Sequence, residues 1–429
     1  MQYWHRQLLT ALAVSTALTA CSKGGGATTA SGPVRRDSAG VQIVENTAPL
    51  WAAGKGWVVV DSPLVDIGGK AGDPAYDLPQ VTGVIMLADG RLAVGVGGAY
   101  QVRFFAPDGT HLATLGRKGS GPGEFQALGA MWRFPGDSVM VTDFMLRRLT
   151  VVSDSGQLGR SFSLGGEAGF QMPQGGRFSF AMPGGILPDG RVLAVAQAFR
   201  VNDARPGAYR DSADYILYSN SGSAPDTLGR FPAIEMEQVT MTMGAQSFSA
   251  PTPVPLGKTT PTAIVGNDLM ISMNDRWEIE QHRSDGTLKR LIRLNVAPKE
   301  IGADDISAHR NVMRQAIEDQ PMLRGMPTQI KQQMFDRVEK ASYPKTFPFI
   351  AAIDGSADGS TWVFEQARPG VEQRVYAVFD SSGAFLGRVT FPDRFEPRTI
   401  GVDKVAGVWK DADDVEHVRV YAIRKSSEQ

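Results

Sequence analysis

Nine charged or amide side chains in the middle of the chain could together bind a ligand. They occupy four short segments that follow strand-like runs: TDFMLRR, QAFRVNDARPGAYRDSAD, MNDRWE and EQARPGVEQR. The residues are Asp143, Arg147, Arg148, Arg200, Asn274, Asp275, Arg276, Glu365 and Arg374. Guanidinium groups bind anions bidentately, so a gathering of these residues would form a polar pocket. The same charges also suit solvated loops with local ion pairs, and the sequence leaves both interpretations open.

Residue types for other common chemistries are sparse. Outside the N-terminal segment the histidines are single and never at metal-ligand spacing: His111, His282, His309 and His417. No Gly-x-Ser-x-Gly elbow of a serine hydrolase occurs. The sequence therefore assigns no catalytic, cofactor-binding or metal-binding residue, and we predict no cofactor.

The glycine-rich stretch GRKGSGPGEFQ, residues 116–126, looks at first like a phosphate-binding loop. Such a loop occurs once and ends in Gly-Lys-Ser/Thr at the start of a helix. Here related stretches begin at Ile67, Leu115 and Leu164, 48 and 49 positions apart, and each leads toward further strand-like sequence. The stretch is therefore predicted to join repeating units.

Each repeating unit reads as four short strands. VTGVIMLADG, RLAVGVGG, QVRFFAPDG and THLATLG form one unit, and the Asp-Gly pairs favour tight hairpins. The length after Ile67, less the insertions, accommodates about six units of about 48 residues. The last unit, residues 398–423, has three strands, so SPLVDIGG, residues 62–69, is predicted to supply its outer strand. Strands from both chain ends would then close the ring and remove open edges.

The glycine joint that ends in Gly123, Glu124 and Phe125 resembles the linker of NHL repeats. From Val41 to Arg424 the chain resembles the six-bladed β-propellers of the NHL-repeat and TolB-like group. This resemblance implies an all-β fold with four-stranded antiparallel blades. It leaves function open, because these propellers include scaffolds, binding proteins and unrelated enzymes. Among them are calcium-dependent lactonases, whose ligand set could be imitated here by Asn274, Asp275, Asp143 and Glu365.

One insertion has helical periodicity. Apolar residues recur at three- and four-residue spacing from Ile306 to Ile317 and from Ile330 to Val338. Pro321 and Gly325 interrupt the pattern, so a helical hairpin is predicted at about residues 301–340. It follows an outer strand, and it should emerge on the face that carries the loops between second and third strands. We expect it over the mouth of the central channel.

The N-terminus has a secretory pattern. A polar start with Arg6 precedes an apolar run from Leu8 to Leu18 that is too short to span a bilayer. Leu18-Thr19-Ala20-Cys21 resembles the bacterial lipobox, which implies that Cys21 is lipidated after cleavage. The expected organisation is a signal peptide (residues 1–20), a lipidated flexible tether (21–40) and a propeller (41–429). Ser22 after the cysteine favours the outer membrane by the same resemblance.

The composition limits the partners. The formal net charge is −1, and there is no basic block, which argues against nucleic acid. Cys21 is the only cysteine, so the body holds no intrachain disulfide. We expect a monomeric, membrane-tethered, non-catalytic propeller of the cell envelope that binds a protein, peptide or glycan through its upper face. The alternative is an extracytoplasmic hydrolase or lyase that uses a divalent cation such as calcium.

Overall fold

The structure, a computed structural model, describes residues 32–70, 72–165, 177–203, 205–243, 246–319 and 328–425. The predicted signal peptide, the lipobox with Cys21 and the first part of the tether lie outside these residues. Among the residues that are described, no helix is long and apolar enough to cross a bilayer.

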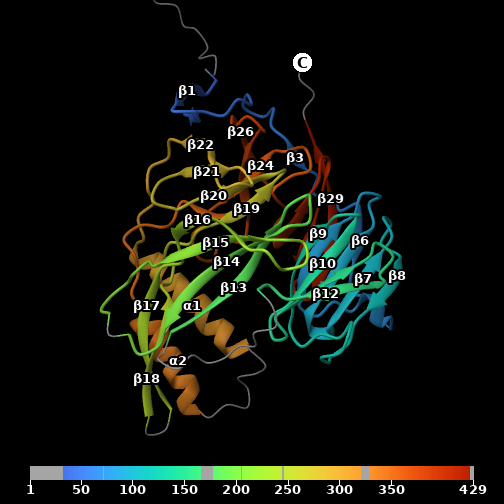
Figure 1. Cartoon of the computed structure of the whole chain (residues 1–429), viewed down its shortest axis with the longest axis horizontal. Coiled ribbons are helices and arrows are strands. Elements are labelled where there is room, and N and C mark those ends of the chain that lie inside the picture. The colour runs from blue at the N-terminus through green and yellow to red at the C-terminus, as the bar shows by residue number, and fades with distance from the viewer. Residues whose placement is uncertain are drawn as a thin grey trace, which may run out of the picture.

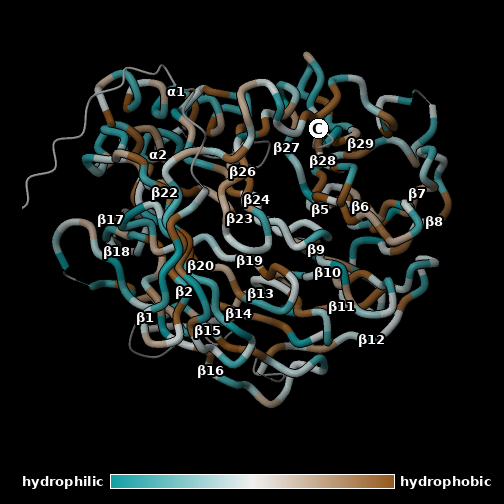
Figure 2. Tube along the Cα trace, turned by 90° about the horizontal axis from the view of Figure 1, so that it is seen from above, coloured by the Kyte–Doolittle hydropathy of each residue, from teal (hydrophilic) through white to brown (hydrophobic). Residues whose placement is uncertain are grey.

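Six four-stranded antiparallel blades surround a central axis, as predicted (Figure 2). Blades 1 and 2 contain β5 (Val81–Met86), β6 (Leu92–Val96), β7 (Gln101–Phe105) and β8 (His111–Leu115), then β9 (Leu128–Phe134), β10 (Ser138–Asp143), β11 (Arg148–Val152) and β12 (Leu158–Phe162). Blades 3 and 4 contain β13 (Arg177–Ile186), β14 (Val192–Arg200), β15 (Ser212–Tyr218) and β16 (Asp226–Pro232), then β19 (Thr262–Val265), β20 (Asp268–Ile271), β21 (Glu278–His282) and β22 (Leu288–Leu294). Blades 5 and 6 contain β23 (Ile350–Gly355), β24 (Thr361–Glu365), β25 (Val375–Phe379) and β26 (Phe385–Thr390), then β27 (Phe395–Ile400), β28 (Lys404–Lys410), β29 (Glu416–Arg424) and β4 (Val65–Ile67). Two single 3₁₀ turns, Pro74–Tyr76 and Gly97–Ala99, lie beside blade 1.

Asp-Gly sequences form hairpin turns, both between first and second strands and between third and fourth strands. In blade 1 the Leu87 N–H donates to the Arg91 carbonyl at 2.8 Å, and Gly90 has a φ of +86°. Glycine adopts this left-handed conformation without the steric cost that a side chain would add. The local sequence therefore fixes the hairpin register of the inner strands.

The stretch GRKGSGPGEFQ is a joint between blades 1 and 2, as predicted. Phe125 is fully buried in the cluster between these blades, and its N–H donates to the Arg117 carbonyl at 2.9 Å. Glu124 accepts a hydrogen bond from the Gly121 N–H and pairs with Arg117, each at 2.8 Å. The glycines let the chain fold back on itself while Phe125 anchors it.

The ring closes where the sequence predicted. In β4, Val65 and Ile67 pair with Val420 and Val418 of β29 in an antiparallel register. Ile67 is fully buried between blades 1 and 6. The segment 62–69 is thus the outer strand of the last blade, and the prediction is confirmed.

Residues 34–67, which include β4, lie along the outer edges of blades 4, 5 and 6, and we call this segment the belt. β1 (Val34–Ser38) pairs with β2 (Val41–Asn46), and β2 lies parallel to β22. The N–H groups of Leu50 and Trp51 donate to β26, and β3 (Val58–Val59) pairs with β29. β1 thus lies within residues 21–40, the segment predicted to be the tether.

The helical insertion exists, but not in the expected place. α1 (Ala303–Asp319) and α2 (Thr328–Lys340) follow β22, and the carboxylate of Asp305 accepts from the Gly302 N–H at 2.9 Å in the first turn of α1. Asp305 also pairs with Arg368 of the β24–β25 loop, so the hairpin lies on the predicted face. Figure 2 shows both helices toward the periphery of the ring rather than over the inner strands. The expectation that they cover the channel mouth is therefore wrong.

A second insertion was not predicted. β17 (Met236–Met243) and β18 (Gln246–Pro253) form a two-stranded hairpin between blades 3 and 4. In Figure 1 this hairpin and the two helices extend from the same end of the molecule, opposite β1 and the C-terminus.

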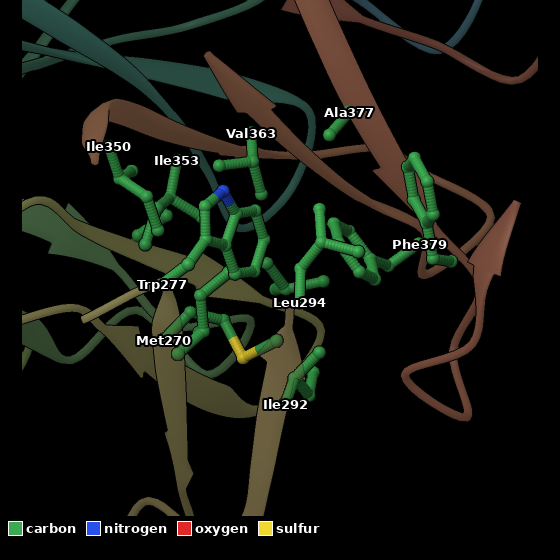
Figure 3. Packing of buried hydrophobic residues seen from close by; sticks show 13 residues of the cluster. Met270, Trp277, Ile292, Leu294, Ile350, Ile353, Val363, Ala377 and Phe379 are labelled. Carbon is green, nitrogen blue, oxygen red and sulfur yellow. The ribbon is translucent and has the colours of Figure 1, made fainter. Parts of the chain in front are cut away.

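The core consists of clusters between neighbouring blades. Figure 3 shows the cluster between blades 4 and 5, where Trp277 packs among Met270, Leu294 and Ile350. Each blade presents one apolar face to each neighbour because successive side chains of a strand point to opposite faces. The interfaces between neighbouring blades, which we call seams, are not all packed equally. The candidate site lies at a seam that is incompletely filled.

Candidate functional site

The upper face, defined as the face with the loops between second and third strands, carries all nine residues singled out in the sequence. They come from blades 2, 3, 4 and 5. Their hydrogen-bond and ion-pair partners decide which of them could meet a ligand.

Asp143 holds its own loop together. It is 2% exposed, and its carboxylate accepts from the N–H groups of Gln126 (2.7 Å), Ala127 (3.2 Å) and Leu146 (2.9 Å). A carboxylate that accepts three backbone bonds has little capacity left for a ligand. Its role is to shape the β10–β11 turn.

Asn274 joins two blades. Its amide donates to the carbonyls of Ile350 (2.9 Å) and Thr259 (3.1 Å), and its oxygen accepts from the Ile350 N–H at 2.8 Å. The residue is 2% exposed and has a φ of +62°. The two bonds to Ile350 fasten blade 4 to blade 5, and the bond to Thr259 stays on the blade 4 side.

The neighbouring charges make local ion pairs. Asp275 lies 2.5 Å from Lys258, and Arg276 lies 2.7 Å from Glu278. Glu365 lies 3.0 Å from Arg388 and also accepts from the Trp277 indole N–H at 3.2 Å. These contacts match the interpretation as loop charges with local pairs.

Arg374 belongs to a group around a half-buried acid, Asp354, between blades 5 and 6. It lies 3.4 Å from Glu396, which also pairs with Arg398 at 3.2 Å. Burial raises the pKa of Asp354 to about 6, although a hydrogen bond from Tyr376 and the two arginines act in the opposite direction. Burial and the nearby Asp354 carboxylate raise the pKa of the Tyr376 phenol.

The proposed calcium ligands do not fit a cation site. The oxygens of Asn274 and Asp143 are occupied by backbone N–H groups, and Asp275 and Glu365 pair with different cations. In the described part of the chain, no group of three or more His, Cys, Asp or Glu side chains could hold a metal ion. We derive no reaction step through a cation.

A cavity of about 490 Å³ lies at the seam between blades 2 and 3; we call it the seam pocket. Its lining is mainly apolar and comes from β9, the β10–β11 loop and β13. The lining includes Trp132, Phe144, Met145, Leu149, Leu164, Ala181, Met182 and Pro183. Phe144, Met145 and Met182 are 55%, 64% and 40% exposed, which is unusual for large apolar side chains gathered at one cavity.

The local sequence explains why these side chains are exposed. Asp143 closes the β10–β11 turn through the Leu146 N–H, and Arg147 adopts a left-handed φ of +50°. The turn is thereby fixed with Phe144 and Met145 at its tip. Arg148 donates to the Ser120 carbonyl at 3.1 Å and to the Glu124 carbonyl. Arg147 and Arg148 therefore add positive charge beside an apolar cavity.

Sequence reasoning selected the charged residues of this loop and did not select its apolar residues, Phe144 and Met145. The structure brings Asp143, Arg147 and Arg148 together at the seam pocket, whereas Arg200 lines a separate cavity on blade 3. Asn274, Asp275, Arg276, Glu365 and Arg374 line neither of these two cavities. Two apolar residues at the tip of a tight turn were the available signal for the pocket. No comparable signal marks Trp132 or Met182, which lie within ordinary strands.

Comparison with known proteins is limited to distant structural likeness. No family model and no curated protein matches the chain. A member of the DUF4221 family from Bacteroides vulgatus is 9% identical, with a TM-score of 0.49 over 86% of this chain and 98% of that chain. A gluconolactonase from Xanthomonas campestris is 13% identical, with a TM-score of 0.41 over 85% and 97%. Virginiamycin B lyase from Staphylococcus aureus is 10% identical, with a TM-score of 0.36 over 84% and 95%. At such identities function must be argued from this chain's own residues.

Proposed function

We propose that the chain is a lipid-anchored, non-catalytic binding protein of the bacterial cell envelope. In this proposal the upper face binds a protein, peptide or glycan ligand, and an apolar group of that ligand enters the seam pocket. The observation that carries the proposal is the mainly apolar lining of a cavity of about 490 Å³. Binding cavities of this size are typically apolar, with a few polar groups at the edge.

The arrangement of the chain ends supports an upper face that points away from the membrane. β1 lies at the opposite end of the molecule from the helical hairpin (Figure 1). Twelve residues separate Cys21 from Val34, and a chain of that length spans at most about 45 Å. A lipid at Cys21 would therefore hold the β1 end close to the bilayer and leave the seam pocket accessible.

The anchor has its own test. Cys21→Ser should abolish metabolic labelling with palmitate and release the protein from the membrane fraction, because stable anchoring needs more than one acyl chain. The matched control is Ser22→Ala, which should remain labelled. Labelling that persists in the Cys21 variant would refute the lipoprotein assignment.

The probe for the seam pocket is 4-phenylbutyrate. Its phenyl ring should pack in the apolar cavity, and its carboxylate should bind near the guanidinium groups of Arg147 and Arg148. Full-length protein labelled at the methionine methyl groups is titrated in detergent and followed by NMR. The Met145 and Met182 signals should shift in a saturable manner, while the signal of Met313 on α1, which is 39% exposed, should not. Ala181→Trp, which fills the pocket, should weaken binding at least tenfold. Equal shifts at Met313, or no effect of Ala181→Trp, would contradict the proposal.

A further inference from the structure

A second cavity of about 490 Å³, the blade 3 cavity, lies on the sheet of blade 3. Small side chains line part of it: Ser179, Ala196, Ala198 and Ser212. Its remaining lining is charged: Arg200, Asp203, Arg205, Asp211, Asp214 and Arg230. Three arginines and three aspartates leave the described lining with no net formal charge.

The charged side chains are held in place by one another. Arg205 donates to both oxygens of Asp211 at 2.8 and 2.9 Å and to Asp203 at 2.7 Å, and its guanidinium lies 3.8 Å from the centre of the Tyr209 ring. These bonds raise the pKa of Arg205 above its ordinary value. Arg230 donates to Asp214 at 2.7 Å. The cavity thus presents a pre-ordered set of N–H donors and carboxylate acceptors.

The blade 3 cavity adjoins the seam pocket along one face of the blade 3 sheet. Ala181, which lines the seam pocket, is the register partner of Ala196, which lines the blade 3 cavity. Ala196 is in turn opposite Asp214, and Asp214 is opposite Arg230. Directly opposite residues share one sheet face, with Cβ atoms about 5 Å apart. One row of side chains therefore leads from the apolar pocket, over two alanines, to an ion pair.

The residues that line the blade 3 cavity limit the class of ligand that it can bind. The backbone groups beneath the cavity belong to the paired ladders of β13, β14, β15 and β16, so a peptide cannot add to this surface as a strand. Recognition must use side chains. Equal numbers of cations and anions give no advantage to a charged ligand, whereas each hydroxyl of a sugar can donate to a carboxylate and accept from a guanidinium.

From this adjacency we infer that the blade 3 cavity is a carbohydrate subsite, and that the two cavities together bind a neutral glycoside whose apolar aglycone occupies the seam pocket. This inference rests on the proposed function, because the seam pocket holds the aglycone. It adds the class of the ligand and the residues that recognise its polar part.

The test compares glycosides with an apolar probe that has no sugar. Phenyl β-D-glucoside, phenyl β-D-galactoside and phenyl N-acetyl-β-D-glucosaminide are titrated into full-length protein in a non-glycosidic detergent, with the Met182 methyl signal as readout. At least one glycoside should bind about tenfold more tightly than 4-phenylbutanol, since a single hydrogen bond to a charged group accounts for a factor of that size. Asp214→Ala should remove this advantage and leave 4-phenylbutanol binding unchanged.

The controls separate the possible failures. Asp214 and Arg230 side chains are 39% and 68% exposed, so both variants should fold, and Arg230→Leu serves as the second variant. If 4-phenylbutanol binds but no glycoside gains affinity, or if Asp214→Ala and Arg230→Leu leave the gain intact, the carbohydrate inference is overturned and the proposed function stands. Tighter binding of phenyl phosphate than of every glycoside also overturns it. If no probe shifts Met145 or Met182 selectively, the proposed function itself fails.

Discussion

The interface between blades 4 and 5 is packed differently from the interface between blades 2 and 3. Between blades 4 and 5, Trp277 is 3% exposed and Asn274 joins the two blades by two hydrogen bonds to Ile350. Between blades 2 and 3, Trp132 is only partly buried, and Asp143 of the β10–β11 turn forms its three bonds within blade 2 and the joint before it. The first seam is closed to its upper edge, whereas the second opens into the seam pocket.

The belt also distinguishes the two regions, because its contacts are with blades 4, 5 and 6. It contacts the outer edges of blades 4, 5 and 6 through β2, Leu50–Trp51 and β3–β4. Asn46, 3% exposed, donates to the carbonyls of Arg293 in blade 4 and Gly383 in blade 5. Gly387 has no side chain, and a Cβ there would lie 2.3 Å from the Trp51 ring, so the belt can approach β26 closely. These belt contacts thus lie in the half of the ring that does not contain the seam pocket.

The largest expected effect comes from removing the end of the belt. Deleting residues 62–69 removes β4, including the fully buried Ile67, and leaves β29 with an unpaired edge. Unpaired strand edges promote aggregation, and buried backbone groups without partners are costly. We expect the variant to be recovered mostly as aggregate, measured by size-exclusion chromatography. A monomeric variant with the melting temperature of the parent protein would show that the ring does not depend on this closure.

Several of these features could be predicted from the sequence because their signals are local. Strand alternation, Asp-Gly turns and the repeated glycine joint identify the blades, and the three-strand last unit identifies the need for residues 62–69. The first part of the belt has no such signal. Gln42 pairs with Arg290, 248 positions away, and nothing near Val41 indicates a partner at that distance.

The candidate site was harder to predict for a different reason. Charged residues in loops suggest a ligand, but most of those on the upper face are satisfied by partners within their own loop or blade, as Arg276 is by Glu278. The seam pocket arises where two blades fail to fill the space between them. Such a space depends on how β9 and β13 sit relative to each other, which no short segment encodes.

The second prediction compares the two tryptophans directly. Trp277→Ala should lower the free energy of unfolding by about 3–5 kcal/mol, the usual cost of emptying a buried aromatic site. Trp132→Ala should cost about 1 kcal/mol, since that side chain is already partly exposed, but should weaken 4-phenylbutyrate binding. Urea unfolding and the methyl NMR titration measure the two effects. Equal losses of stability would mean that the two seams are equally packed and would remove the basis for the comparison.

The third and smallest effect concerns the free-energy cost of burying the Asp354 carboxylate between blades 5 and 6. Asp354 lies between blades 5 and 6 beside Tyr376, Arg374, Arg398 and Glu396, and burial raises its pKa to about 6. In the unfolded chain the pKa of an aspartate is about 3.9. As pH rises from about 4 to about 6, the unfolded chain releases this proton while the folded protein retains it, so the contribution of Asp354 to stability falls across that window and stays constant above it.

Replacing the ionisable group tests this cost. Asp354→Asn retains a polar side chain for Tyr376 but cannot ionise, so it should stabilise the protein by about 1–2 kcal/mol at pH 7.5 and have little effect at pH 4. Asp275→Asn, at an exposed side chain paired with Lys258, is the matched control and should show no such gain. Urea unfolding of both variants and the parent protein at several pH values gives the difference. If the gain is the same at pH 4 and pH 7.5, ionisation of Asp354 does not lower the free energy of unfolding, and the mutation acts through packing instead.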